Sequence, residues 1–157
     1  MKTEMLRAGL IYGGGDLAAT LLTGQLNPLR SLGMLAVGAC IYAPEIRWYF
    51  ARLEQRFPPP LGPRRQALRA VLAWLWFNPL WIARHALFIR LFSGRITEIS
   101  PALLHTGLLS FAVNMPVALT ANFLIQNRVP LPWRVSASAT FSALMAVYYA
   151  LSEVWFG

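Results

Sequence analysis

The stretch between Glu98 and Arg128 carries no acidic or basic side chain apart from His105. A helix rises about 1.5 Å per residue, so about 20 mainly apolar residues are enough to cross the hydrocarbon layer of a bilayer. The run over residues 99–127 is longer than this, and a second apolar run over residues 135–152 follows closely. This pattern predicts a polytopic membrane protein.

The composition agrees with a chain embedded in a membrane. Of its 157 residues, 57% are hydrophobic and 13% are charged, whereas a soluble domain carries about 25% charged residues. The net charge is +8, and the arginines lie between the apolar runs rather than in a basic tail. This distribution favours contacts with lipid phosphates, so we expect membrane lipids as partners and no nucleic-acid partner.

Five apolar segments divide the chain, separated by charged or proline-rich stretches. They cover residues 8–26, 31–50, 67–92, 101–126 and 133–152. The clearest break is a Pro- and Arg-rich loop at 52–66, because consecutive prolines lack N–H groups and disfavour helix. The third segment is the one whose crossing stays open, since its uncharged stretch over residues 70–83, between Arg69 and Arg84, is short for a full crossing. We predict an all-α fold, a single domain over residues 1–157, as a polytopic transmembrane bundle of four to five membrane-embedded helices.

Small residues predict how these helices pack. Gly9 and Gly13 form a Gly-x-x-x-Gly pair. In the last segment a small residue recurs at every fourth position, at Ser138, Ser142, Ala146 and Ala150. Lipid supplies no hydrophobic driving force between helices, so close approach along small residues holds a bundle together. We expect both sets at contacts within the chain; the alternative is a contact with a partner.

Aromatic and basic residues gather near the predicted segment ends. The aromatic ones are Trp48, Tyr49, Trp74, Trp76, Trp81, Trp133 and Trp155. Because Trp and Tyr prefer the headgroup level, we expect an interfacial belt, with ordinary packing as the alternative. The arginines around the proline-rich loop are Arg52, Arg56, Arg64, Arg65 and Arg69. We expect them to bind headgroups of anionic phospholipid, which is cardiolipin if the membrane is mitochondrial.

Polar residues inside the apolar segments are the candidates for an intramembrane site. They are Asp16, Asn78, His105, Asn114 and Asn122. An ionised carboxylate in lipid is costly unless it is paired or faces water. The candidate partners for Asp16 are Asn78, Arg84, His105, Asn114, Asn122 and Gln126. We expect Asp16 to cap or pair a helix, and the alternative is a pore or a proton pathway.

No catalytic pattern occurs in the sequence. It has no His and Cys cluster at metal-binding spacing, no phosphate-binding loop before Lys and Ser or Thr, and no Gly-x-Ser-x-Gly. Cys40 is the only cysteine, so an internal disulfide is excluded. We therefore expect a non-enzymatic protein without a metal or a cofactor.

Short motifs along nearly the whole chain occur in the order of a known family pattern. They are Gly15-Asp16, Ala43-Pro44, Trp48-Tyr49, Leu53-Glu54, Arg56-Phe57-Pro58, Phe77-Asn78-Pro79, Pro116, Asn122-Phe123, Val129-Pro130-Leu131, Arg134 and Leu151-Ser152. The set resembles the Mpv-seventeen/peroxisomal-membrane-protein family. The chain departs from that pattern at Thr20, where members carry Gln, and at Met115, where they carry Trp. The resemblance implies a divergent member, in the mitochondrial inner membrane, with the peroxisomal or a bacterial inner membrane as alternatives.

Two functions stay open. The first is a structural accessory subunit of a larger inner-membrane complex of the respiratory type, with other membrane subunits as partners. The departures at Thr20 and Met115 fit a member released from the original family role. The second is a small non-selective channel for metabolites or ions, which the resemblance implies for some members and which needs polar groups that converge on one lumen.

Overall fold

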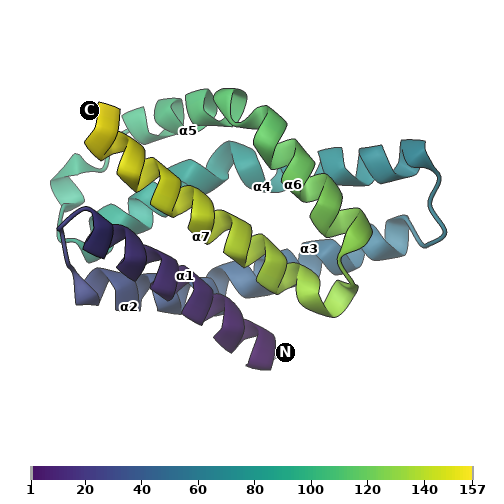
Figure 1. Cartoon of the computed structure of the whole chain (residues 1–157), viewed down its shortest axis with the longest axis horizontal. Helices are drawn as coiled ribbons and strands as arrows, with labels where there is room; N and C mark the ends of the chain where they lie inside the picture. Colours follow the sequence, from purple (N-terminus) through teal and green to yellow (C-terminus); the bar gives the residue numbers. More distant parts are fainter. Residues whose placement is uncertain (1, 157) are drawn as a thin grey trace. The chain divides into compact units, whose positions relative to one another are not determined.

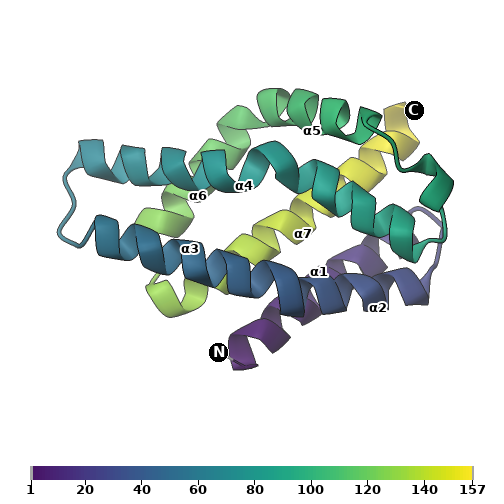
Figure 2. The same cartoon turned by 180° about the vertical axis from the view of Figure 1, so that it is seen from behind.

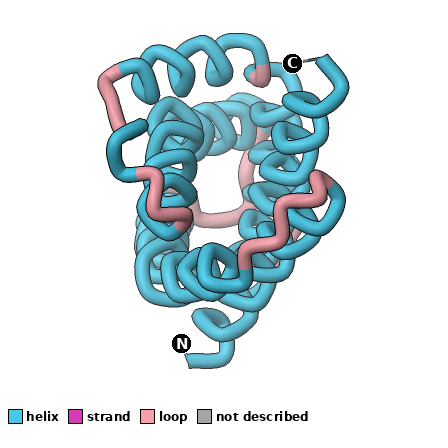
Figure 3. Tube along the Cα trace, turned by 90° about the vertical axis from the view of Figure 1, so that its left-hand side faces the viewer, coloured by secondary structure: helices cyan, strands magenta, loops and turns pink. Residues whose placement is uncertain are grey.

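The computed structural model describes the backbone of residues 2–156, with side chains at all of these positions except 79, 80, 106, 110 and 149–156. Helices account for nearly all of this range and no strand occurs within it (Figure 3), which confirms the all-α class. The chain forms two compact units, residues 1–47 with 135–157 and residues 48–134. Two helices continue across the division, and the expected single domain stays a prediction.

In the first unit, α1 (Lys2–Leu22) packs on α2 (Pro28–Val37) (Figure 1). Gly24 ends α1 with a φ of +68°, and the N–H of Gln25 donates back to the Thr20 carbonyl at 2.8 Å. Asn27 caps α2 with its side-chain oxygen, and Pro28 suits the first helical turn. The turn between the two helices therefore follows from local sequence.

A π-helical turn lies inside the second predicted segment. α2 passes without a break through η1 (Gly38–Tyr42) into α3 (Ala43–Arg56). Pro44 has no N–H to donate to the preceding turn. The π-turn lies directly before it, where the N–H of Ala43 donates to the Gly38 carbonyl. The helix consequently continues past Pro44 without a break.

Among the described residues, one helix is long and apolar enough to cross a bilayer. It is the continuous helix Pro28–Arg56, whose most apolar 18-residue stretch has a mean hydropathy of 1.2. The later helices α5 (Ala102–Val113) and α6 (Met115–Arg128) pass the same test only together, and they are bent by 72°. The finding is consistent with membrane association, although core helices of soluble proteins pass this test too. The number of crossings stays a prediction.

The second unit is built around α4 (Pro63–Phe92). α3 and α4 lie side by side, joined by a short loop (Figure 2), and the hydroxyl of Tyr49 donates to the Leu72 carbonyl at 2.8 Å. α4 also packs against α5 and α6, with the ring of Trp74 stacked on that of Phe111 at 4.5 Å. The 3-10 turn η2 (Ile96–Glu98) joins α4 to α5, and α7 (Leu131–Phe156) follows α6.

Two predicted boundaries are wrong. The loop placed at 52–66 is only 57–62, because α3 continues to Arg56 and α4 begins at Pro63. Proline is accepted in the first turn of a helix, where its missing N–H has no partner to lose. The segment placed at 101–126 is divided at Asn114, since Pro116 cannot continue α5 and instead lies in the first turn of α6.

Helix α1 has a buried face of small and polar residues and an exposed face of leucines. The buried face holds Gly9, Tyr12, Gly13, Asp16 and Thr20. The exposed face holds Leu6, Leu10, Leu17 and Leu21. α5 likewise exposes Leu104, Leu108, Leu109 and Val113. In a water-soluble bundle the leucines would face the core and the carboxylate would face solvent, so this arrangement is the reverse of the soluble one.

Glycines set the spacing of α1 against its neighbours. As predicted, Gly9 and Gly13 lie at a helix contact, and a Cβ at Gly13 would lie 2.8 Å from the Cβ of Leu35. A Cβ at Gly15 would lie 2.7 Å from that of Ala143 in α7. Ala139 and Ala143 of α7 are buried, whereas the predicted stripe residues Ser138, Ser142 and Ala146 are half-buried. The side chains of Ala150 and Trp155 lie outside the described residues.

Gly13→Ala is expected to destabilise the fold, because the new methyl group would also lie 3.2 Å from the carbonyl oxygen of Ser31. Overpacking of this kind costs about 1–3 kcal/mol. Gly14 is the matched control: it is exposed in the same helix, and a Cβ there meets nothing within 4 Å. Gly14→Ala is expected to stabilise the helix by about 0.5–1 kcal/mol. Thermal unfolding in detergent micelles compares them, and equal midpoints would contradict the close α1–α2 contact.

Candidate functional site

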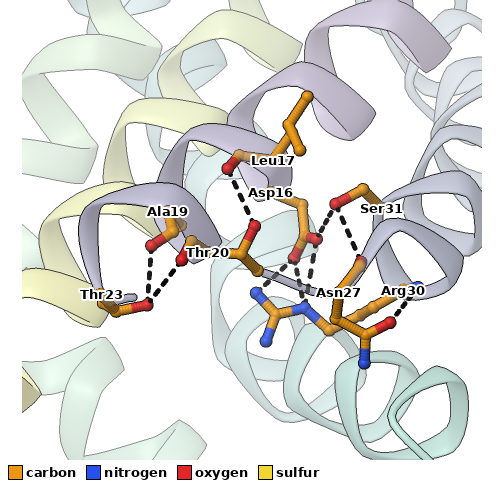
Figure 4. A network of polar contacts seen from close by, with 8 residues as sticks. All are labelled: Asp16, Leu17, Ala19, Thr20, Thr23, Asn27, Arg30 and Ser31. Atoms are coloured by element: carbon orange, nitrogen blue, oxygen red, sulfur yellow. Dashed lines mark hydrogen bonds and ion pairs between the residues drawn. The ribbon is translucent and has the colours of Figure 1, made fainter. Parts of the chain in front are cut away.

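Asp16 lies in a closed polar network at the start of α2 (Figure 4). The Nε of Arg30 donates to Oδ1 at 2.9 Å and to Oδ2 at 3.1 Å, and a second guanidinium nitrogen, Nη2, lies 2.9 Å from Oδ1. The hydroxyl of Ser31 donates to Oδ2 at 2.7 Å. Nearby, the hydroxyls of Thr20 and Thr23 donate to carbonyls of α1 itself. The carboxylate, expected to be paired, is thus paired within its own unit.

Local structure places the two donors. The Asn27 side chain accepts the backbone N–H of Arg30 at 3.0 Å, which fixes the first turn of α2 beside α1. The positive end of the helix dipole at this turn also favours a carboxylate. The Asp16 side chain is only 2% exposed and that of Arg30 13%, so little water reaches the pair. The candidate partners drawn from the sequence do not include Arg30 or Ser31, and Asp16 therefore has other partners than predicted.

A second buried network lies in the other unit. Oε2 of Glu54 in α3 accepts from Arg69 in α4 and from Arg134 at the start of α7. The Nε of Arg69 also donates to Oε1 of Gln126 in α6, at 3.4 Å. Arg134 donates from its Nε to the Val129 carbonyl at 2.8 Å. The carboxylate thereby joins α3 to α4 and to the start of α7, and Arg69 extends the network to α6.

The charges in this network do not balance. Two guanidinium groups share one carboxylate, so the group carries a formal charge of +1. The side chains of Arg69 and Arg134 are 2% and 8% exposed. The Nε2 of Gln126 is also buried and has no hydrogen-bond partner among the described residues. Arg69 is therefore not one of the exposed headgroup arginines that the sequence predicts, because its guanidinium turns inward to Glu54.

The other predicted polar residues differ in burial and in hydrogen bonding. The amides of Asn78 and Asn122 donate to carbonyls one turn back on their own helices, at 3.4 and 2.8 Å. Asn114 lies half-buried at the break between α5 and α6, and its side chain does not cap α6. His105 is exposed on α5. The structure thus gives two of these residues bonds within their own helices.

An exposed aromatic cluster lies between α3 and α4. The ring of Trp48 lies 5.8 Å from that of Trp76, and the ring of Tyr49 stacks on Trp76 at 4.7 Å. The guanidinium of Arg52 lies over Trp48, 5.2 Å from the ring centre. Trp48 and Trp76 are each nearly half exposed. Three of these residues belong to the aromatic belt that the sequence predicts, and Arg52 belongs to the predicted headgroup arginines. Their contact with one another is visible only in the structure.

The described residues contain no group of three or more His, Cys, Asp or Glu that could hold a metal ion. Comparison with protein-family models, with curated proteins and with solved structures found no match to this chain.

Proposed function

We propose that this chain is a polytopic membrane protein that serves as a structural accessory subunit of a larger inner-membrane complex of the respiratory type. The observation that carries the proposal is a set of buried charged and polar groups together with exposed leucine faces on two helices. Charged and polar groups such as Asp16, Arg69 and Gln126 are buried, while leucines of α1 and α5 are exposed.

The exposed leucines need a cover. A leucine side chain is stabilised by about 1.5–3 kcal/mol when it leaves water completely. Single exposed leucines are ordinary, but contiguous apolar faces mark membranes or partner proteins. Lipid chains and the helices of neighbouring subunits both cover such faces. A bundle of four or five crossings, as the sequence predicts, would place these faces in the bilayer.

The polar groups support a structural role better than a lumen. A pore needs polar side chains that face one water-filled path. Asp16 is instead closed by Arg30 and Ser31, and Asn78 and Asn122 bond their own helices. Groups already satisfied inside the protein have little left to offer an ion or a metabolite.

The resemblance to the Mpv-seventeen/peroxisomal-membrane-protein family supports the choice of membrane. Members are small multi-pass proteins of the mitochondrial inner membrane or of the peroxisomal membrane. Two of the motif residues have structural roles here, since Asp16 and Glu54 are the central carboxylates of the two buried networks. A family pattern that serves the fold would persist in a subunit that has no transport activity.

Native-gel electrophoresis of membranes solubilised in a mild detergent tests the proposal. We expect the chain to resist extraction by alkaline carbonate and to migrate with an assembly many times heavier than its own 17.5 kDa. Mass spectrometry of that band then identifies the companion subunits. A chain that migrates alone and conducts ions as the purified protein in planar bilayers would overturn the proposal in favour of the channel.

A further inference from the structure

We propose that an anionic phospholipid binds along the exposed stripe Trp48–Arg52–Arg56 of α3, with Trp76 of α4 beside it. The inference rests on the membrane location proposed above. It adds a site, a ligand class and an orientation of the helix in the bilayer. These residues form the α3 stripe.

The stripe follows from helical spacing. Its three α3 residues are four positions apart, so they lie above one another on one face of the helix. All three are exposed. The ring of Trp76 extends the aromatic end of the stripe across to α4. One end of the surface is therefore aromatic, and the other end carries two guanidinium groups.

The positions match the layers of a membrane. The apolar part of the candidate span Pro28–Arg56 ends about one turn before Trp48, because the charged residues Glu45 and Arg47 precede this tryptophan. Four residues of helix rise about 6 Å, which is close to the thickness of one headgroup layer, roughly 5–8 Å. With Trp48 at the edge of the hydrocarbon, Arg52 lies at the level of the phosphates. Arg56 lies one turn further out, within reach of headgroup oxygens.

The chemistry favours an anionic amphiphile over an acidic protein. Exposed indole rings prefer the membrane interface, and planar guanidinium groups bind phosphate oxygens in bidentate fashion. The cation–π contact holds the Arg52 guanidinium beside the ring, so one lipid meets both surfaces at once. Glu54, the acidic residue between Trp48 and Arg56, is engaged by the buried Arg69 and Arg134 rather than by the arginines of the stripe.

Native mass spectrometry of the full chain, purified in detergent, tests the site with added phosphatidylglycerol and, for comparison, phosphatidylcholine. We expect the wild-type chain to retain phosphatidylglycerol in preference. Arg52→Gln with Arg56→Gln is expected to weaken this binding about 30-fold, since each arginine near anionic lipid contributes about 1 kcal/mol. The matched control is Arg64→Gln with Arg65→Gln, which removes the same charge from exposed positions in the first turn of α4. The sequence groups these two arginines with Arg52 and Arg56 as headgroup ligands, whereas the stripe proposal assigns the bound lipid to α3. We expect the control to retain most of the lipid.

Trp48→Leu tests the aromatic end separately. We expect it to lower phosphatidylglycerol retention several-fold, whereas Trp133→Leu, at another exposed tryptophan, is expected to leave retention unchanged. Equal losses in the two arginine pairs would mean general charge attraction and would overturn the site. Equal retention of both lipids by a chain that still needs detergent would overturn the site and leave the membrane proposal standing. A chain that purifies without detergent would overturn the membrane location itself.

Discussion

Glu54→Gln is expected to lower the free energy of unfolding by about 3–5 kcal/mol. The carboxylate of Glu54 is the shared acceptor for the buried guanidinium groups of Arg69 and Arg134. Removing one partner of a buried ion pair leaves a charge without its counter-charge, and the remaining acceptors here, Gln126 and the Val129 carbonyl, are uncharged, which is why the effect is large. Here the change leaves two such charges, and it places an amide, a weaker acceptor, between them.

Thermal unfolding in detergent micelles, followed by the helical circular dichroism signal, measures this effect. Glu98→Gln is the matched control, because Glu98 also lies near two arginines, Arg90 and Arg95. Its side chain is 47% exposed, and pairs of this kind contribute about 0–1 kcal/mol. Glu54→Asp, which keeps the charge, is expected to recover part of the stability. Similar midpoints for Glu54→Gln and Glu98→Gln would show that the buried network does not hold these helices together.

The sequence predicts much of the fold because helix signals are local. The apolar runs, the proline-rich break and the Gly9–Gly13 pair each depend on neighbouring residues, and each has a counterpart in the helices described. The errors occur at prolines, because proline disrupts the interior of a helix but is favoured in its first turn. Pro63 and Pro116 lie in first helical turns, where proline is favoured.

The pairing of the buried charges could not be predicted in the same way. Whether Arg69 turns outward to lipid or inward to Glu54 depends on how α3 and α4 pack, and both orientations have the same local sequence. Asp16 shows the opposite case. Its cost in an apolar helix indicates that it needs a partner, but the partner, Arg30, belongs to the next helix beyond a turn. Gly24 and Asn27 indicate a tight turn between two antiparallel helices, and such a turn would place Arg30 near Asp16.

Asp16→Leu is expected to destabilise the chain by about 3 kcal/mol, because the guanidinium of Arg30 and the hydroxyl of Ser31 lose their acceptor in a site that excludes water. A double-mutant cycle separates this loss from a loss of packing. Arg30→Met alone leaves the carboxylate buried without its counter-charge and is expected to cost a similar amount. The double variant Asp16→Leu with Arg30→Met removes both charges and is expected to recover most of the stability, since apolar side chains of similar size replace a buried pair at little cost.

The same variants separate the structural role of Asp16 from a role in a pore. If Asp16 only joins α1 to α2, then the double variant assembles into the native complex as the wild-type chain does, despite having no carboxylate at this position. A lumen carboxylate predicts the reverse result. Asp16→Leu would then unfold at the same temperature as the wild type and would shift the ion selectivity of the purified protein in planar bilayers. Restored stability with normal assembly, and no conductance in either chain, is the outcome that the closed geometry of Asp16, Arg30 and Ser31 predicts.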